Sequence, residues 1–187
     1  MDKKLIYSIG HGTRKIEDFL SILKQYSIQY LIDVRSQPYS KFSPQFNQNN
    51  LKHYLELHNV KYVFMGDSLG GRPKDITCYD NEGKVDYIKI KEKDFYIEGI
   101  SRLKTAYHKG IGVVIMCSES KPTECHRSKL IGMSLLEDEK EKITITHIDE
   151  NGRLKDQATV MNELNKGRNH KDLFDEQSNT TSRKSYA

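Results

Sequence analysis

The stretch IGVVIMC at residues 111–117 is the most hydrophobic part of this 187-residue chain. A continuous apolar run of this length predicts a strand that is buried on both faces, as strands of a parallel sheet are. The run ends at Cys117, polar residues follow, and a helical apolar pattern begins near His126. The same order of strand, polar loop and helix recurs along the chain.

Further strand-like segments cover residues 4–9, 28–34, 60–65 and 143–148. Apolar residues at helical spacing mark the segments 16–23, 51–58, 95–107, 126–137 and 157–164. This alternation predicts an α/β fold: a mainly parallel sheet of about five strands, flanked by helices on both faces. We expect residues 1–165 to form a single α/β domain. Residues 166–187, in which Asn, Ser, Thr, Lys and Arg dominate, are expected to form a flexible C-terminal tail.

The composition excludes several classes of protein. The apolar runs are too short to span a membrane, and the first residues lack the apolar core of a signal peptide. Three cysteines without an export signal indicate reduced thiols, so a cytoplasmic location is expected. The net charge of +4 permits a phosphate-bearing partner such as a nucleotide or nucleic acid without requiring one. The oligomeric state stays open.

Polar and reactive residues follow each predicted strand at the point where the strand ends. They lie in the segments 10–12, 33–36, 66–72, 117–119 and 147–149. Ligands of parallel α/β sheets bind beyond the carboxyl ends of the strands. We therefore predict an active site at this edge, although each segment taken alone also suits a solvated loop.

The candidate catalytic residues are a reactive thiol and groups that exchange protons. Cys117 or Cys125 is the candidate thiol, and a buried structural role for Cys117 is the alternative. The proton-transfer candidates are His11, Asp33, Glu119 and His126, which follows Cys125 directly.

The candidate anion-binding residues are Arg35, Ser36 and Arg127, with Gly10 and Gly12 allowing close approach of the backbone to a ligand. Arg127 stands at the predicted start of a helix, where backbone N–H groups favour anions. Its alternative role is to pair with Asp33 or Glu119 and brace the loops. Three aromatic residues, Tyr39, Phe42 and Phe46, interleave with Lys41, Gln45 and Asn47 and could stack on bases. The favoured interpretation is that Phe42 and Phe46 pin this loop to the core.

A metal site is a weaker alternative at the same residues. Cys117, Cys125 and His126 offer two thiolates and an imidazole, a ligand set that suits zinc. The two cysteines are eight positions apart and do not form a C-x-x-C pair. The sequence therefore requires neither a metal nor another cofactor.

The motifs together resemble the bacterial and archaeal family catalogued as domain of unknown function 488. The similar segments are YSIGHG (7–12), LIDVRSQPYS (31–40), PQF (44–46), LGGR (69–72), MCSE (116–119), CHR (125–127) and HI (147–148). The resemblance covers about residues 4–150 and implies a site without an established reaction. Its site residues here are His11, Asp33, Arg35, Ser36, Cys117, Glu119, Cys125, His126 and Arg127. Ser118 stands where many relatives have alanine.

A second resemblance is to rhodanese sulfurtransferases, which also carry Asp-Val-Arg at a strand end and a later reactive cysteine. Here Cys117 is followed by Ser-Glu-Ser-Lys-Pro and not by a glycine- and arginine-rich loop. In the tail, Asp172-Leu173-Phe174 resembles the end of the peptide with which bacterial proteins dock on the replisomal sliding clamp.

The leading hypothesis is an enzyme that acts on an anionic, nucleotide or nucleic-acid-related substrate. One alternative is a rhodanese-like sulfurtransferase that uses a cysteine persulfide. The other is a non-enzymatic module that senses a nucleotide or serves as an adaptor in DNA processing.

Overall fold

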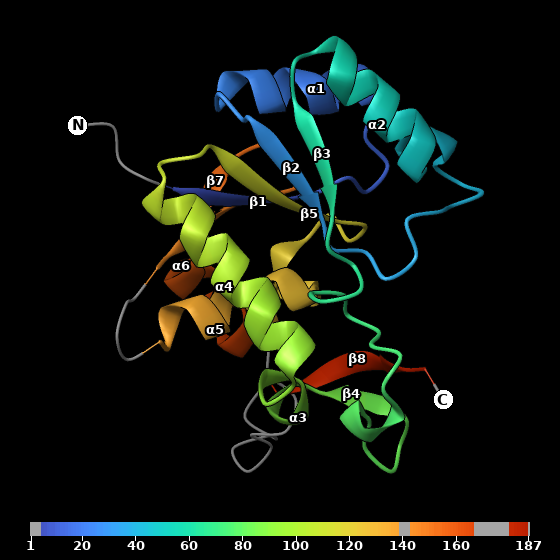
Figure 1. The fold of residues 1–187 in the computed structure, drawn as a ribbon, viewed down its shortest axis with the longest axis vertical. Coiled ribbons are helices and arrows are strands. Elements are labelled where there is room, and N and C mark those ends of the chain that lie inside the picture. Colours follow the sequence, from blue (N-terminus) through green and yellow to red (C-terminus); the bar gives the residue numbers. More distant parts are fainter. Residues whose placement is uncertain (1–4, 139–142, 167–179, 187) are drawn as a thin grey trace.

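The computed structural model describes residues 5–138, 143–166 and 180–186 (Figure 1). Its centre is a six-stranded sheet with the strand order β3-β2-β5-β1-β6-β7. All neighbouring strands are parallel except β6 and β7, which form an antiparallel pair at one edge. The strands are β1 (Ile6–Gly10), β2 (Tyr30–Asp33), β3 (Lys61–Phe64), β5 (Val113–Cys117), β6 (Ile145–Ile148) and β7 (Leu154–Asp156). This confirms the predicted α/β class; β7 is a strand that the sequence pattern does not reveal.

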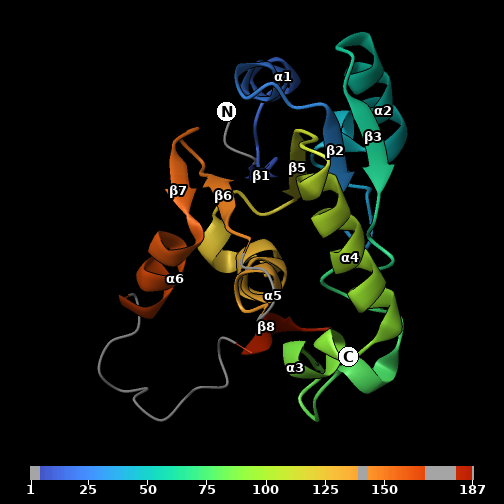
Figure 2. The same ribbon diagram turned by 60° about the vertical axis from the view of Figure 1, so that its left-hand side comes forward.

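Helices cover both faces of the sheet, α1 and α2 on one and α4 and α5 on the other (Figures 1 and 2). The α-helices are α1 (Ile16–Gln25), α2 (Gln48–Leu57), α3 (Tyr87–Lys91), α4 (Asp94–His108), α5 (Met133–Leu136) and α6 (Gln157–Lys166). Short 3₁₀ turns lie at Pro44–Phe46, Ile76–Cys78 and Pro122–Glu124. No helix in the described ranges is long and apolar enough to cross a membrane.

The central strand β5 decides which face the reactive residues join. Val114 and Met116 belong to the core under α1 and α2, whereas Ile115 and Cys117 belong to the core under α4 and α5. Alternate residues of a strand point to opposite faces, so this register follows directly from the strand geometry. Cys117 therefore ends β5 on the α4/α5 side of the sheet.

The predicted helix over 126–137 has a different form in the structure. Arg127–Gly132 make a π-helical turn, and only Met133–Leu136 continue as α5. π-Turns arise from local insertions in helices and are frequent at functional sites. This turn begins immediately after Cys125 and His126, two of the candidate site residues.

A small second sheet includes part of the chain that the sequence predicts as a flexible tail. The strand β8 (Thr181–Ser185) pairs antiparallel with β4 (Lys84–Asp86). The buried Ser182 hydroxyl accepts the N–H of Val85 at 2.9 Å, and the N–H of Tyr186 donates to the Gly83 carbonyl. Because β8 is polar and shows no alternation of apolar and polar residues, the sequence pattern does not predict it as a strand. The predicted docking motif at 172–174 lies outside the described residues.

Candidate functional site

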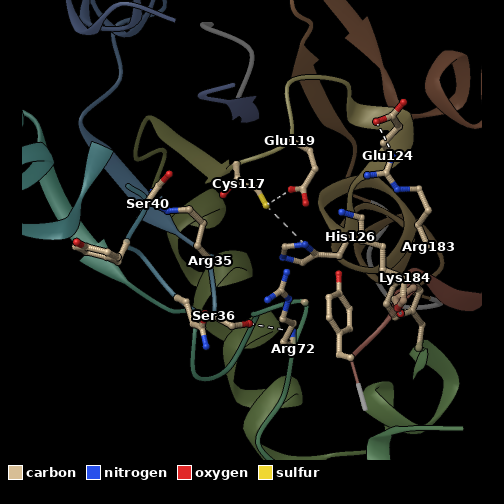
Figure 3. A pocket seen from close by; sticks show the side chains of 17 residues that line it. Arg35, Ser36, Ser40, Arg72, Cys117, Glu119, Glu124, His126, Arg183 and Lys184 are labelled. Carbon is tan, nitrogen blue, oxygen red and sulfur yellow. Dashed lines mark hydrogen bonds and ion pairs between the residues drawn. The ribbon is translucent and has the colours of Figure 1, made fainter. Parts of the chain in front are cut away.

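A pocket of about 270 Å³ lies where β2 and β5 end (Figure 3). Its walls come from the loop after β2, from Gly71 and Arg72, and from β8. Cys117, Glu119 and His126 contribute to the lining. The pocket thus occupies the carboxyl edge of the sheet, where the sequence predicts a site.

The two cysteines and the histidine come together in the structure. The Cys117 Sγ lies 3.8 Å from the His126 Nδ1, and the Cys125 Sγ lies 3.7 Å from the same nitrogen. The Cys117 thiol donates a hydrogen bond to the Glu119 carboxylate at 2.8 Å. Cys117, Cys125 and His126 are all buried, and Cys125 stands behind the pocket lining. These contacts form one cluster, which we call the cysteine cluster.

The surroundings of the two thiols set their pKa values apart. Burial alone would raise the pKa of Cys125, but the neighbouring Cys117 thiol and the charges of Arg127 and His126 outweigh it and hold the pKa well below its usual range. The neighbouring Cys125 sulfur, then burial, raise the pKa of Cys117. Burial opposes the charged imidazole of His126, yet the adjacent Cys125 raises its pKa. The thiol that faces the pocket is therefore the less acidic one.

Arg127 does not occupy the position predicted for an anion ligand. Its side chain is fully buried, and its donors point to protein atoms: Nε to the Cys125 Sγ, Nη1 to the Ser8 hydroxyl, and Nη2 to the carbonyls of Glu119 and Ser120. A guanidinium engaged in this way is not available to a ligand in the pocket. These contacts make Arg127 a brace that holds the loop after β5 against β1, but it contacts backbone carbonyls and not the carboxylates of Asp33 or Glu119 that the sequence suggests.

Asp33, Arg35 and His11 form a second buried group beside the pocket. Asp33 accepts two hydrogen bonds from the Arg35 side chain, at 2.9 and 2.6 Å, and a third from the Tyr62 hydroxyl at 2.7 Å. Because it is fully buried and surrounded by donors, Asp33 does not face the pocket as a general base. Of this group, Arg35 alone reaches the pocket lining.

His11 is also set back from the pocket. Its ring stacks on Phe46 with the ring centres 4.4 Å apart, and its Nε2 lies 3.3 Å from an Arg35 nitrogen. Burial, followed by the charge of Arg35, lowers the pKa of His11 to about 4. A neutral imidazole in this place supports Arg35, and the structure does not put it within the pocket as a proton-transfer group.

Gly10 and Gly12 allow two loops to approach each other, not a ligand to approach the backbone. A Cβ on Gly10 would lie 1.8 Å from the Glu119 carbonyl oxygen. The N–H groups of His11 and Gly12 donate to the carbonyls of Cys117 and Ser118. Gly12 has a φ of +51°, which favours glycine. The two glycines thus position Glu119.

Several pocket residues were not among the predicted site residues. Arg72 follows the Gly70-Gly71 pair, and its backbone N–H donates to the Ser36 hydroxyl at 2.9 Å. Ser36 lines the pocket as predicted. Three further pocket residues lie in β8 or directly after it: Arg183, Lys184 and Tyr186. The one sequence signal for them is that the polar tail ends in basic and aromatic residues.

The fold and the site define a class: an α/β protein with a cysteine cluster at the carboxyl edge of a mostly parallel sheet. The family model described as "Domain of unknown function DUF488" matches residues 15–133, and the chain belongs to this family. The matched range contains the cysteine cluster, Asp33 and Arg35, and it begins after His11. No curated protein and no solved structure matches the chain.

Proposed function

We propose that the protein is an enzyme that binds an anionic, nucleotide-type substrate in the pocket and acts on it beside Glu119. One observation carries this proposal: a rim of cationic and aromatic side chains surrounds a floor made by Cys117, Glu119 and His126 (Figure 3). Binding groups and reactive groups within one pocket are what an active site requires.

The rim supplies charge for a phosphate. Within the described ranges, Arg72 and Lys184 line the pocket without a carboxylate partner, whereas Arg183 pairs with Glu124 at 2.8 Å. Guanidinium and ammonium groups make charge-assisted hydrogen bonds to phosphate oxygens. Arg35 adds a third cation whose charge is partly balanced by Asp33. The excess of available cations favours an anionic ligand.

Aromatic rings line the same pocket. Tyr39, Tyr87 and Tyr186 contribute to its walls, and the Arg72 guanidinium lies 4.1 Å from the centre of the Tyr186 ring. Phe46 is fully buried and pins the loop after β2 to the core, as the sequence predicts, whereas Phe42 is almost fully exposed and does not. Flat rings beside cations suit a nucleobase next to a phosphate. This combination supports a nucleotide or a nucleic-acid end over a simple inorganic anion.

The two alternative functions make different demands on the same residues. A sulfurtransferase needs an accessible thiolate to accept sulfur, but the Cys117 thiol donates to Glu119, and Cys125 stands behind the lining. A nucleotide-sensing module needs the rim and makes no use of Glu119 at the floor. The enzyme proposal accounts for both parts of the pocket.

The test combines binding with turnover. A panel of nucleotides and short single-stranded oligonucleotides is incubated with the full chain, and products are sought by mass spectrometry. Arg72→Gln should weaken binding, and Glu119→Gln should abolish turnover while binding persists. Arg102→Gln, at an exposed arginine of α4 outside the pocket, should change neither.

Binding that Arg72→Gln leaves unchanged, or turnover that Glu119→Gln leaves unchanged, would refute the proposal. Binding without any product would favour the sensing module. A persulfide on Cys117 or Cys125 after thiosulfate treatment would favour the sulfurtransferase.

We also propose a cytoplasmic location. All three cysteines are free thiols, which the reducing cytosol maintains. Recovery of the protein in the membrane or secreted fraction of its source cells would contradict this.

A further inference from the structure

The ligand atoms of the cysteine cluster have the spacing of ligands around a common metal ion. The Sγ atoms of Cys117 and Cys125 and the Nδ1 of His126 all lie within 4.8 Å of one another. The two sulfur–nitrogen distances are 3.8 and 3.7 Å. Zinc bonds of about 2.3 Å to sulfur and about 2.0 Å to nitrogen, at tetrahedral angles, put these ligand atoms about 3.6 Å apart. The three atoms are therefore close to their positions in a zinc site before any ion is added.

The buried imidazole of His126 lacks a strong partner in the described structure. Its Nε2 has no hydrogen-bond partner among the described residues, and its Nδ1 faces the two sulfur atoms. Buried polar side chains that have no strong partner are uncommon and call for an explanation. A metal ion would give Nδ1, which has only the two sulfur contacts at 3.8 and 3.7 Å, a strong partner, because imidazole nitrogen and thiolate are preferred zinc ligands. Nε2 would keep its proton on the opposite side of the ring from the metal.

Neighbouring groups hold the ligands in place. Arg127 donates both its backbone N–H and its Nε–H to the Cys125 Sγ, at 3.5 and 3.2 Å. Such hydrogen bonds to a ligating sulfur are typical of the groups that orient metal ligands. The His126 ring packs against Gly71, where a Cβ would lie 2.9 Å from Nδ1. Besides bracing the loop, the buried Arg127 would therefore orient the Cys125 sulfur as a metal ligand.

A tetrahedral ion held by these three ligands would have a fourth position left for water or a ligand from the pocket. Cys117 and His126 line the pocket, and Cys125 lies behind them. Three protein ligands with an open fourth position are the pattern of catalytic zinc sites. The Glu119 carboxylate also lines the pocket and lies 2.8 Å from the Cys117 Sγ and 3.5 Å from the Cys125 Sγ.

We propose that Cys117, Cys125 and His126 bind a zinc ion that activates water for hydrolysis of the nucleotide-type substrate. The zinc site stands on the geometry alone; its use in hydrolysis rests on the proposed function. Zinc-bound water transfers a proton to Glu119, and the hydroxide attacks an electrophilic carbon or phosphorus. The bond to the leaving group breaks, and Glu119 returns the proton to that group. Water is the co-reactant, and no electrons are exchanged with another reagent.

The first experiment measures metal content. The full chain, produced without a histidine tag in zinc-supplemented medium, is desalted and analysed by mass spectrometry for metals. We expect stoichiometric zinc in the wild type and background zinc in Cys117→Ser, Cys125→Ser and His126→Ala. Cys78→Ala is the matched control, because Cys78 is a buried free thiol outside the cluster and its variant should keep the metal. Wild-type protein that retains no zinc would overturn the inference.

A second measurement uses the wild type and does not depend on variants that fold. Cobalt(II) added to metal-free protein should produce the thiolate-to-cobalt charge-transfer band and the visible bands of a tetrahedral site. Azide should then shift the visible bands by entering the open position. Absence of the charge-transfer band would overturn the metal site, and bands that azide does not change would overturn the open position.

Failure of this inference and failure of the proposed function are distinguishable. Arg72→Gln should keep its zinc while losing nucleotide affinity, because Arg72 is not part of the cluster. A zinc-free protein that still binds and converts a nucleotide would refute the metal site and leave the proposed function standing. A zinc-loaded protein that binds no nucleotide would refute the proposed function and leave the metal site standing.

Discussion

Asp33 and Arg35, two residues apart at the end of β2, form an ion pair in which both charges are buried. Two hydrogen bonds, at 2.9 and 2.6 Å, join the carboxylate to the guanidinium. Arg35 also donates to the Phe46 carbonyl at 2.8 Å, which ties the loop after β2 to the 3₁₀ turn that follows it. The pair therefore shapes one wall of the pocket from behind.

Removing the charge of Asp33 should destabilise the fold strongly. Asp33→Asn leaves the buried Arg35 without its counter-ion, and we expect a loss of about 3–5 kcal/mol in the free energy of unfolding. Urea denaturation followed by circular dichroism measures this loss. Glu56→Gln, which breaks the exposed pair with Lys52, is the control and should leave the midpoint unchanged. Equal midpoints for the two variants would contradict the role of the buried pair.

His147 should make stability depend on pH. It is fully buried between the Ser8 hydroxyl and the side-chain amide oxygen of Gln157, and burial lowers its pKa from 6.5 to about 4. Between pH 6.5 and 4 the unfolded chain binds a proton that the folded chain excludes. Stability should therefore fall as the pH is lowered through this window, by up to about 3 kcal/mol from this residue.

Urea unfolding at several pH values tests this contribution. His147→Gln should reduce the slope between pH 6.5 and 4, and the slope that remains should come in part from His11, whose pKa is also lowered to about 4. His53→Gln, at an exposed histidine, should keep the wild-type slope. A His147→Gln slope as steep as that of the wild type would show that other groups cause the acid sensitivity.

Gly10 should tolerate no side chain. A Cβ at this position would lie 1.8 Å from the backbone oxygen of Glu119, so the loop after β5 would have to move. We expect Gly10→Ala to cost about 3 kcal/mol of stability and to displace Glu119 from the pocket floor. Gly110→Ala is the comparison: Gly110 has a φ of +66° but no neighbour within 4 Å, so it should cost about 1–2 kcal/mol and leave the pocket intact. A stable, fully active Gly10→Ala protein would contradict this account.

The strand β8 should matter for binding more than for folding. Deleting residues 181–187 removes Arg183, Lys184 and Tyr186 from the pocket rim, while the six-stranded sheet does not contain β8. We expect nucleotide affinity to fall about tenfold, which corresponds to about 1.4 kcal/mol, with the circular dichroism spectrum largely kept. The full-length double variant Arg183→Gln/Lys184→Gln removes the two charges but keeps β8, so it distinguishes the effect of the charges from the effect of losing the strand. Unchanged nucleotide affinity in both proteins would show that β8 does not contribute to binding.

The resemblance of Asp172-Leu173-Phe174 to the end of a clamp-docking peptide leads us to propose a partner, with a chance match as the alternative. Leu173 and Phe174 would fill an apolar pocket on the bacterial sliding clamp, so replacing both by alanine should abolish capture of the clamp in a pulldown. Asn169→Ala, in the same segment, should leave capture unchanged. Capture that persists without Leu173 and Phe174 would exclude this motif.

Much of this protein follows from local patterns in its sequence. Strand and helix periods predicted β1, β2, β3, β5 and β6 and the helices that cover them, because local apolar spacing reports directly which face is buried. Polar residues after each strand predicted where the pocket lies, since parallel strands bring their carboxyl ends to one edge.

The partners of individual side chains depend on contacts between distant segments. The position of Arg127 near a helix start predicts an anion ligand, yet the fold buries its side chain against Ser8 and the loop after β5. Asp33 reads as a base, yet Arg35 and Tyr62 surround it. A local pattern cannot show which donors a fold will bring to a buried carboxylate or sulfur atom.

The sequence by itself determined the α/β class, the family and the edge of the sheet that carries Cys117 and Glu119, because strand period and strand ends are local properties. Only the tertiary structure decided that Cys125 and His126 join Cys117 in one cluster, and that β8 returns to the pocket rim. The cluster depends on how the loop between Cys117 and Cys125 folds back on itself, and the position of β8 depends on its pairing with the distant strand β4. A local apolar pattern reports neither the path of a polar loop nor the partner of a polar strand.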